Sequence, residues 1–142
     1  MNDDIQEIIS RIEHFEPTDD GWLELDGLIQ RLLAFEHPER GIDALLGVLE
    51  RFPEGDGYGV FWSILHALES LPGYQNKLVE SVLRRPSEMT VTMINRMLNA
   101  GLTEVGGTNL LILLENVARN QTYPAAIREE AKGYIEWQNR RI

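Results

Sequence analysis

Apolar residues recur at helical spacing along almost the whole chain, and no stretch alternates apolar and polar residues as a half-buried strand does. Prolines separate the periodic runs. Because proline is tolerated in the first turn of a helix and excluded from its interior, each one marks a helix end. Four of them follow one another at intervals of 36, 33 and 38 residues, and two more stand at the opposite junctions: Pro17, Pro53, Pro86 and Pro124, then Pro38 and Pro72.

The pattern predicts eight helices arranged as four hairpins. Helix pairs that repeat every 33–38 residues are typical of an α-solenoid. We therefore expect an all-α fold, a right-handed α-solenoid of about four HEAT-like helical hairpins in one domain, residues 1–142. The predicted helices run over residues 3–15, 20–35, 39–52, 57–71, 74–84, 87–100, 107–120 and 124–140.

The second helix of each predicted hairpin carries a narrow polar strip beside its apolar face. Second helices lie side by side in such a stack, so their strips are expected to line one shared groove. Helix 57–71 is apolar nearly all round, which predicts a central position for it. The strips consist of Asp20, Glu24, Gly27 and Arg31; of Gly59, Ser63, His66 and Ser70; and of Thr92, Asn95, Arg96 and Asn99.

Two acidic turns lead into the first two second helices, Pro17-Thr18-Asp19-Asp20-Gly21 and Pro53-Glu54-Gly55-Asp56-Gly57. Equivalent turns of neighbouring hairpins should lie at one rim, roughly 10 Å apart. One aspartate per turn would cap free helix amides. The surplus carboxylates repel one another, so a binding surface is an equally good interpretation. Glu16, Glu24 and Glu88 would extend the acidic patch.

Aromatic residues accompany the acidic turns, and aromatic side chains beside charges are common anchors of protein interfaces. Trp22 follows Asp20, while Tyr58 and Trp62 follow Asp56. Core packing is the alternative for both tryptophans, and for Trp62 we favour it. Tyr58, which lies in a first turn between two glycines, is the better candidate for an exposed contact.

Further along, His66 is interpreted as a polar residue on the groove side in preference to a general base or metal ligand. Asn95, Arg96 and Asn99 form a compact hydrogen-bonding set at positions i, i+1 and i+4. These three side chains would either contact a partner or bridge neighbouring hairpins, with Arg96 paired to an acid of an adjacent repeat.

The composition provides little for catalysis. The chain has no cysteine, no histidine pair at metal-ligand spacing and no phosphate-binding glycine loop with its lysine. Ser63, His66 and Glu69 share one helix, which cannot orient them as a triad around a substrate. We therefore expect no enzyme activity, no cofactor and no metal.

The charge is distributed unevenly. Residues 1–70 hold sixteen acidic and four basic side chains, whereas residues 71–142 hold seven and nine. A lopsided acidic field suits a basic protein partner, and a net charge of −10 argues against nucleic-acid binding. The acidic start, Met1-Asn2-Asp3-Asp4, is unlike a secretory signal, and no apolar run approaches the roughly 20 residues of a membrane span. We expect a cytoplasmic protein, without membrane contact and monomeric when free.

Two resemblances add to these expectations. Ile127-Arg128, Ala131 and Tyr134-Ile135 resemble the second helix of a HEAT or armadillo repeat, although Tyr134 stands where a small residue is usual. Segment 52–66 (FPEGDGYGVFWSILH), followed by Pro86-Ser87-Glu88 and Met93-Ile94-Asn95-Arg96, resembles helical immunity proteins of bacterial polymorphic toxin systems, of the contact-dependent inhibition or Rhs type.

This second resemblance implies a function: stoichiometric occlusion of a cognate toxin domain, often a nuclease, by an acidic surface. The alternative is a small HEAT-like adaptor that binds a protein without inhibiting it. The residues expected to contact the partner are Asp19, Asp20, Trp22, Glu24, Glu54, Asp56, Tyr58, Trp62, His66, Asn95, Arg96 and Asn99.

Overall fold

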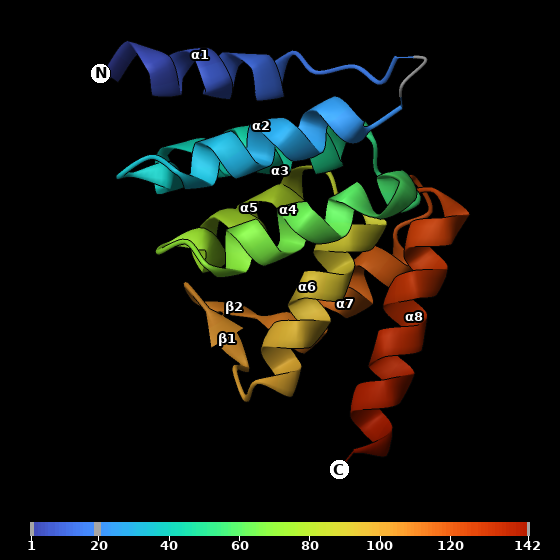
Figure 1. The fold of residues 1–142 in the computed structure, drawn as a ribbon. Coiled ribbons are helices and arrows are strands. Elements are labelled where there is room, and N and C mark those ends of the chain that lie inside the picture. The colour runs from blue at the N-terminus through green and yellow to red at the C-terminus, as the bar shows by residue number, and fades with distance from the viewer. Residues whose placement is uncertain (1, 19–20, 142) are drawn as a thin grey trace.

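Helices account for most of the chain in the computed structural model, which describes residues 2–18 and 21–141 (Figure 1). The predicted all-α class is confirmed, because the only strands in these residues are two of two residues each. The helices are α1 (Asn2–Glu13), α2 (Leu23–Leu33), α3 (Ile42–Arg51), α4 (Val60–Glu69), α5 (Tyr74–Arg84), α6 (Glu88–Asn99), α7 (Leu110–Arg119) and α8 (Ala125–Arg140).

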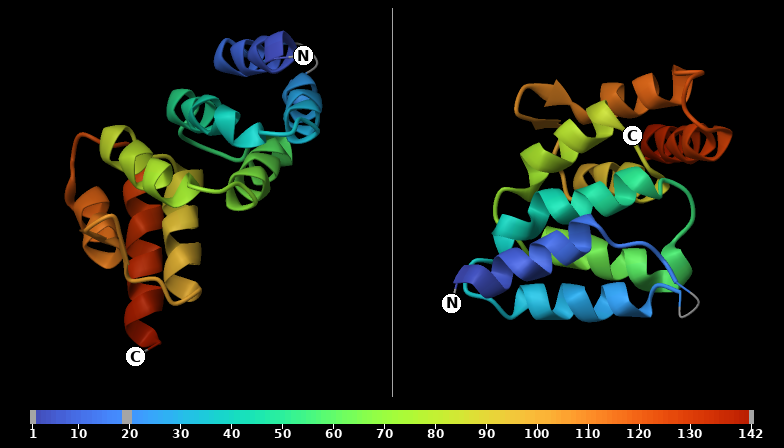
Figure 2. Two further views of the ribbon diagram at one scale, coloured as in Figure 1. Left: turned by 90° about the vertical axis from the view of Figure 1, so that its left-hand side faces the viewer. Right: turned by 90° about the horizontal axis from the view of Figure 1, so that it is seen from above.

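Consecutive helices contact one another in pairs, and the pairs pack on one another in two layers. The first helices α1, α3 and α5 contact each other in order, and the second helices α2, α4, α6 and α8 do the same. The left view of Figure 2 shows α3 and α5 on one side of the stack and α2 and α4 on the other. These neighbour relations are those that stacked hairpins require, while the right-handed sense of a solenoid stays a prediction.

The direction of the helices changes in the second half of the chain. Helices α1 to α5 run across Figure 1, whereas α6 and α8 run steeply down it, side by side below one end of α4. The N-terminal helix and the end of α8 consequently lie at opposite ends of the molecule. The faces of α6 and α8 are therefore set at an angle to the layer formed by α2 and α4.

A continuous apolar core runs through all the hairpins. Helix α4 buries five residues of its ten and contacts α2, α3 and α6, so its expected central place is confirmed. This burial is the main source of stability, since the hairpins hold together largely through apolar surface removed from water. Fully buried side chains of the core include Ile12, Leu25, Leu45, Phe61, Ile64, Leu68, Leu114 and Ile127.

Two of the second helices start later than predicted. The helix expected over 20–35 begins at Leu23, and the helix expected over 57–71 begins at Val60, after the single 3₁₀ turn η2 (Gly57–Gly59). Three consecutive positive φ angles, at Gly57, Tyr58 and Gly59, exclude an α-helix there. A second 3₁₀ turn, η1 (Pro38–Gly41), precedes α3 where the helix 39–52 was expected.

The helix expected over 107–120 is also shorter, because its first residues form a small hairpin. Strands β1 (Glu104–Val105) and β2 (Thr108–Asn109) pair in antiparallel fashion around Gly106 and Gly107. Both glycines have positive φ, 55° and 84°, which a two-residue hairpin turn of this kind demands. Helix α7 then starts at Leu110, with the side chain of Asn109 accepting the amide of Ile112.

Polar side chains join successive hairpins, and we call these contacts the seams. Glu50 of α3 accepts hydrogen bonds from Arg84 and Ser81 of α5, at 2.7–2.9 Å. Burial alone would raise the pKa of Glu50, but the bonds from Arg84 and Ser81 outweigh it and hold that pKa below its ordinary value. Arg51 donates to the carbonyls of Ile12 and Phe15, which ties α3 to the end of α1.

Candidate partner-binding surface

The turns that precede α2 and α4 lie side by side. Together they form an open pocket of about 580 Å³, with Thr18, Gly21 and Leu23 on one side and Tyr58 and Val60 on the other. The expected common rim is thus present in the described residues. Asp19 and Asp20, which belong to the first turn, lie outside the described residues.

Trp22 packs beneath this pocket instead of projecting from it. Its ring meets Phe15, Phe52 and Phe61 at centroid distances of 5.5, 5.0 and 5.1 Å, the last two edge-on. Such tilted and edge-on aromatic pairs add to the burial of apolar surface. Trp22 is half-buried, so it fixes the position of the first turn and offers a partner only part of its ring.

Tyr58 is held out into solvent by an unusual backbone. Its φ of 54° and ψ of 38° lie in the left-handed region, and its side chain is 92% exposed. The carbonyl of Asp56 accepts the amides of Gly59 and Phe61, which fixes the turn. A left-handed tyrosine is costly for an L residue. In this turn, the left-handed conformation places a large aromatic side chain at the most exposed position.

The carboxylates beside Tyr58 are available to a partner. Glu24, Glu54 and Asp56 are exposed, and none of their side chains has a hydrogen bond or ion pair with another described residue. Asp56 precedes η2 without a side-chain cap. The capping explanation offered above for Asp56 is therefore wrong. We call the exposed set Leu23, Glu24, Glu54, Asp56 and Tyr58 the lip.

Leu23 is an exposed apolar residue of this surface that the sequence reasoning missed. Its side chain is 72% exposed, although it was counted inside a periodic helix. The buried residues of α2 are Leu25, Leu28, Ile29 and Leu32, and Leu23 stands two residues before the first of them. Two residues correspond to about 200° of helical rotation, so the phase of the apolar stripe already placed Leu23 on the outer face.

Trp62 and His66 lie one helical turn apart on the outer face of α4. The expectation that Trp62 belongs to the core is wrong, since it is 41% exposed. Its ring centroid lies 6.5 Å from that of His66, which is also exposed. No described residue completes a triad with His66, because Glu69 is bound to Arg96.

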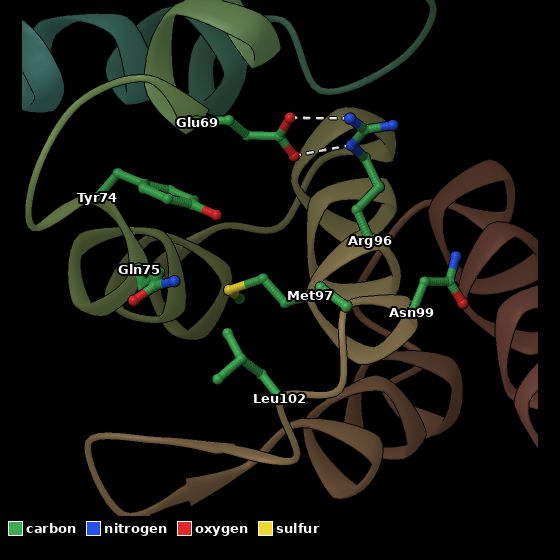
Figure 3. Close-up of a pocket in the computed structure, with 8 residues that line it drawn as sticks. Glu69, Tyr74, Gln75, Arg96, Met97, Asn99 and Leu102 are labelled. Carbon is green, nitrogen blue, oxygen red and sulfur yellow. Dashed lines mark hydrogen bonds and ion pairs between the residues drawn. The ribbon is translucent and has the colours of Figure 1, made fainter.

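Asn95, Arg96 and Asn99 form hydrogen bonds in the seams, the contacts between successive hairpins. Arg96 donates two hydrogen bonds to Glu69 of α4, at 2.7 and 2.9 Å, along the edge of a pocket of about 510 Å³ (Figure 3). Pairing with Glu69 raises the pKa of Arg96 further above its ordinary value. Asn95 and Asn99 both accept from Gln138 of α8. The internal bridging considered above is thus what these side chains do.

Tyr74, at the start of α5, faces the same pocket as Arg96 (Figure 3). Burial and the charge of Glu69 raise the pKa of Tyr74 above its ordinary value. The hydroxyl of Tyr74 is consequently neutral at physiological pH.

Within residues 2–18 and 21–141, no three histidine, aspartate or glutamate side chains are grouped closely enough to hold a metal ion. Over the same residues, no helix has the length and apolar character needed to cross a membrane.

Comparison with protein-family models, with curated proteins and with solved structures finds no match for this chain. The geometry of the lip and the chemistry of its residues therefore carry the functional argument.

Proposed function

We propose that this protein binds a basic protein domain through the lip and neutralises it, as an immunity protein neutralises a cognate toxin. The observation that carries the proposal is the exposure of Tyr58 and Leu23 beside three carboxylates that have no partner among the described residues. Exposed aromatic and aliphatic side chains with charges around them are the usual composition of a binding hot spot and its rim.

The charge distribution supports a basic partner. The lip belongs to the half of the chain that holds sixteen acidic and four basic side chains. Such a field accelerates association with a positively charged surface and slows association with an acidic one. A nuclease active site is basic because it binds phosphates, so carboxylates can occupy the places of those phosphates.

The preformed backbone of the lip supports tight binding. The turn of Tyr58 is fixed by the hydrogen bonds to the carbonyl of Asp56, and Trp22 is fixed by its aromatic neighbours. A surface that is already ordered loses little conformational freedom on association. Carboxylates would then set the rate of association, and the anchors Tyr58 and Leu23 the rate of dissociation.

The proposal is tested with the partner captured from the source cell and identified by mass spectrometry. The lip variant combines Glu24→Gln, Glu54→Gln and Asp56→Asn. A matched control removes the same number of exposed carboxylates elsewhere: Glu36→Gln, Glu80→Gln and Glu104→Gln. We expect the lip variant to bind the partner at least roughly tenfold more weakly at low salt, with a smaller difference at high salt.

Inhibition is measured separately from binding. Cells that express the partner alone should stop growing, and co-expression of the wild-type chain, but not of the lip variant, should restore growth. Equal binding of the partner by the lip variant and by the control would contradict the proposal that the lip is the binding surface. A partner that binds but neither arrests growth nor loses an activity would support the adaptor function instead.

A further inference from the structure

Two adjoining pockets form a groove between α6 and α8 that the lip does not explain. The upper pocket, of about 340 Å³, is bounded by Asp56, Trp62 and Glu88, and the lower one, of about 480 Å³, by Gly133 and Trp137. Both pockets are lined by Glu130 and Tyr134, so they adjoin, and a hydrogen bond of 2.7 Å between the hydroxyls of Tyr134 and Thr92 joins α8 to α6 there. The helices that carry this lining, α6 and α8, are the two that run steeply down Figure 1, below the end of α4.

Exposed tryptophans mark the two pockets of the groove. Trp62 borders the upper pocket and is 41% exposed, and Trp137 borders the lower one and is 46% exposed. The indole of Trp137 is oriented by a hydrogen bond of 3.3 Å to Asn99. An exposed tryptophan face attracts a cation, and a guanidinium stacks on it better than an ammonium does.

The carboxylates of the groove are held in place while keeping free acceptor capacity. Glu88 accepts the amide of Gly55, and Glu130 accepts the hydroxyl of Tyr134 at 2.9 Å. Burial and the charge of Glu130 raise the pKa of Tyr134 to about 12, so this donor stays protonated. Each carboxylate accepts about four hydrogen bonds, and one is used here, so both remain open to a bidentate cation.

Glycine at position 133 keeps the lower pocket open. Gly133 stands in the interior of α8, where glycine is the least favourable residue after proline. Nothing lies within 4 Å of the Cβ that another residue would place there, so packing does not require a glycine. Any longer side chain at this position would enter the lower pocket.

Positive charges stand at the lower pocket, whereas no basic residue lines the upper one among the described residues. Arg141 donates to Asn99, and Lys132 pairs with Glu129 at 3.5 Å; Asn99 and Glu129 both line the lower pocket. Arg96 is bound to Glu69. The stretch from Asp56 to Glu130 therefore keeps its negative charge, which is complementary to a basic ligand.

We infer that this groove binds an extended, arginine-bearing segment of the basic partner, with one arginine side chain in each pocket. An extended chain directs alternate side chains to the same face, so two arginines at alternate positions can both point into the groove. The inference rests on the proposed function, because the partner is the same. It adds a second contact surface and the side chain that this surface recognises.

The test uses the nitrogen-15-labelled full chain and a synthetic peptide of about nine residues with arginine at alternate positions. The indole N–H signals of the three tryptophans report on different places. Trp62 and Trp137 report on the two pockets of the groove, and Trp22 reports on the lip. We expect the Trp62 and Trp137 signals to shift together and to saturate.

A pair of glycine substitutions provides the matched comparison. Gly133→Gln should weaken the peptide affinity at least roughly fivefold while leaving the fold intact, because glutamine favours a helix. Gly27→Gln is the control, since Gly27 is also an exposed glycine inside a helix with no atom within 4 Å of an added Cβ. Gly27→Gln should leave the affinity unchanged.

The other outcomes overturn the inference in distinguishable ways. If the Trp62 signal shifts and the Trp137 signal does not, the peptide binds only in the upper pocket. If only the Trp22 signal shifts, the peptide binds at the lip. Either result would refute binding along the whole groove but would remain compatible with the proposed function. Equal affinity for a peptide with lysine in place of arginine would show that the groove does not distinguish a guanidinium from an ammonium group. The same shifts with a glutamate peptide, no shift with the arginine peptide, or equal effects of the two glycine variants would refute the groove as a basic-peptide site.

Discussion

The lip and the seams contain the same kinds of residue in opposite situations. In the seams, Glu50 and Glu69 are each bound by an arginine of the next hairpin. In the lip, Glu54 and Asp56 have no such partner among the described residues, and Tyr58 is almost fully exposed. Acidity alone therefore does not identify a binding surface. The distinction lies in whether the fold already satisfies the charge.

The aromatic residues differ in the same way. Trp22 is surrounded by three phenylalanine rings below the lip, whereas Trp62 has only His66 as a ring neighbour on the surface of α4. Trp22 therefore supports the lip from below, whereas Trp62 is exposed on α4 and borders the upper pocket of the groove. Substitutions that separate stability from binding test this contrast directly.

The largest expected effect comes from Trp22→Ala. Its removal leaves a cavity among Phe15, Phe52 and Phe61, and should lower the free energy of unfolding by about 3 kcal/mol. Trp62→Ala should lower it by less than about 1 kcal/mol, because the side chain is already partly in water. Urea unfolding monitored by circular dichroism measures both values. Equal losses for the two variants would show that the exposure of Trp62 does not separate it from the core.

A smaller effect is expected when a seam carboxylate is compared with a lip carboxylate. Glu50→Gln should lower the free energy of unfolding by about 1 kcal/mol at pH 6, because Arg84 and Ser81 lose a charged acceptor. Glu54→Gln, the control for loss of one negative charge, should change it by no more than a few tenths of a kcal/mol.

The pH dependence of the Glu50 effect follows from its lowered pKa. The folded chain keeps Glu50 ionised to lower pH than the unfolded chain does, so its contribution is present above the unfolded value, about 4.5. The contribution is lost as the pH falls through the folded value. The difference between wild type and Glu50→Gln should thus shrink as the pH falls below about 4.5. A difference that stays constant over this range would contradict the assigned role of Glu50.

The spacing of apolar residues and the positions of the prolines predicted eight helices, their pairing and the central place of α4. These features succeed because they depend on residues that are close together in the sequence. The sequence pattern missed the late start of α4 and the hairpin at Gly106 and Gly107, since positive φ angles leave no hydrophobic pattern. It placed both acidic turns at one rim. It favoured the core for Trp62 and was wrong, because nearly all sides of α4 are apolar in the sequence, whereas the fold leaves the side that carries Trp62 exposed.

The smallest expected effect concerns the strain in the lip. Tyr58 has a φ of 54°, a region that asparagine tolerates far better than tyrosine. Tyr58→Asn should therefore raise the free energy of unfolding by a few tenths to about 1 kcal/mol, while weakening the binding of the basic partner. Urea unfolding gives the first quantity and calorimetric titration the second. The proposed function requires the exposed Tyr58 side chain to contact the partner, so a stabilised variant with unchanged affinity would remove Tyr58 from the proposed binding surface.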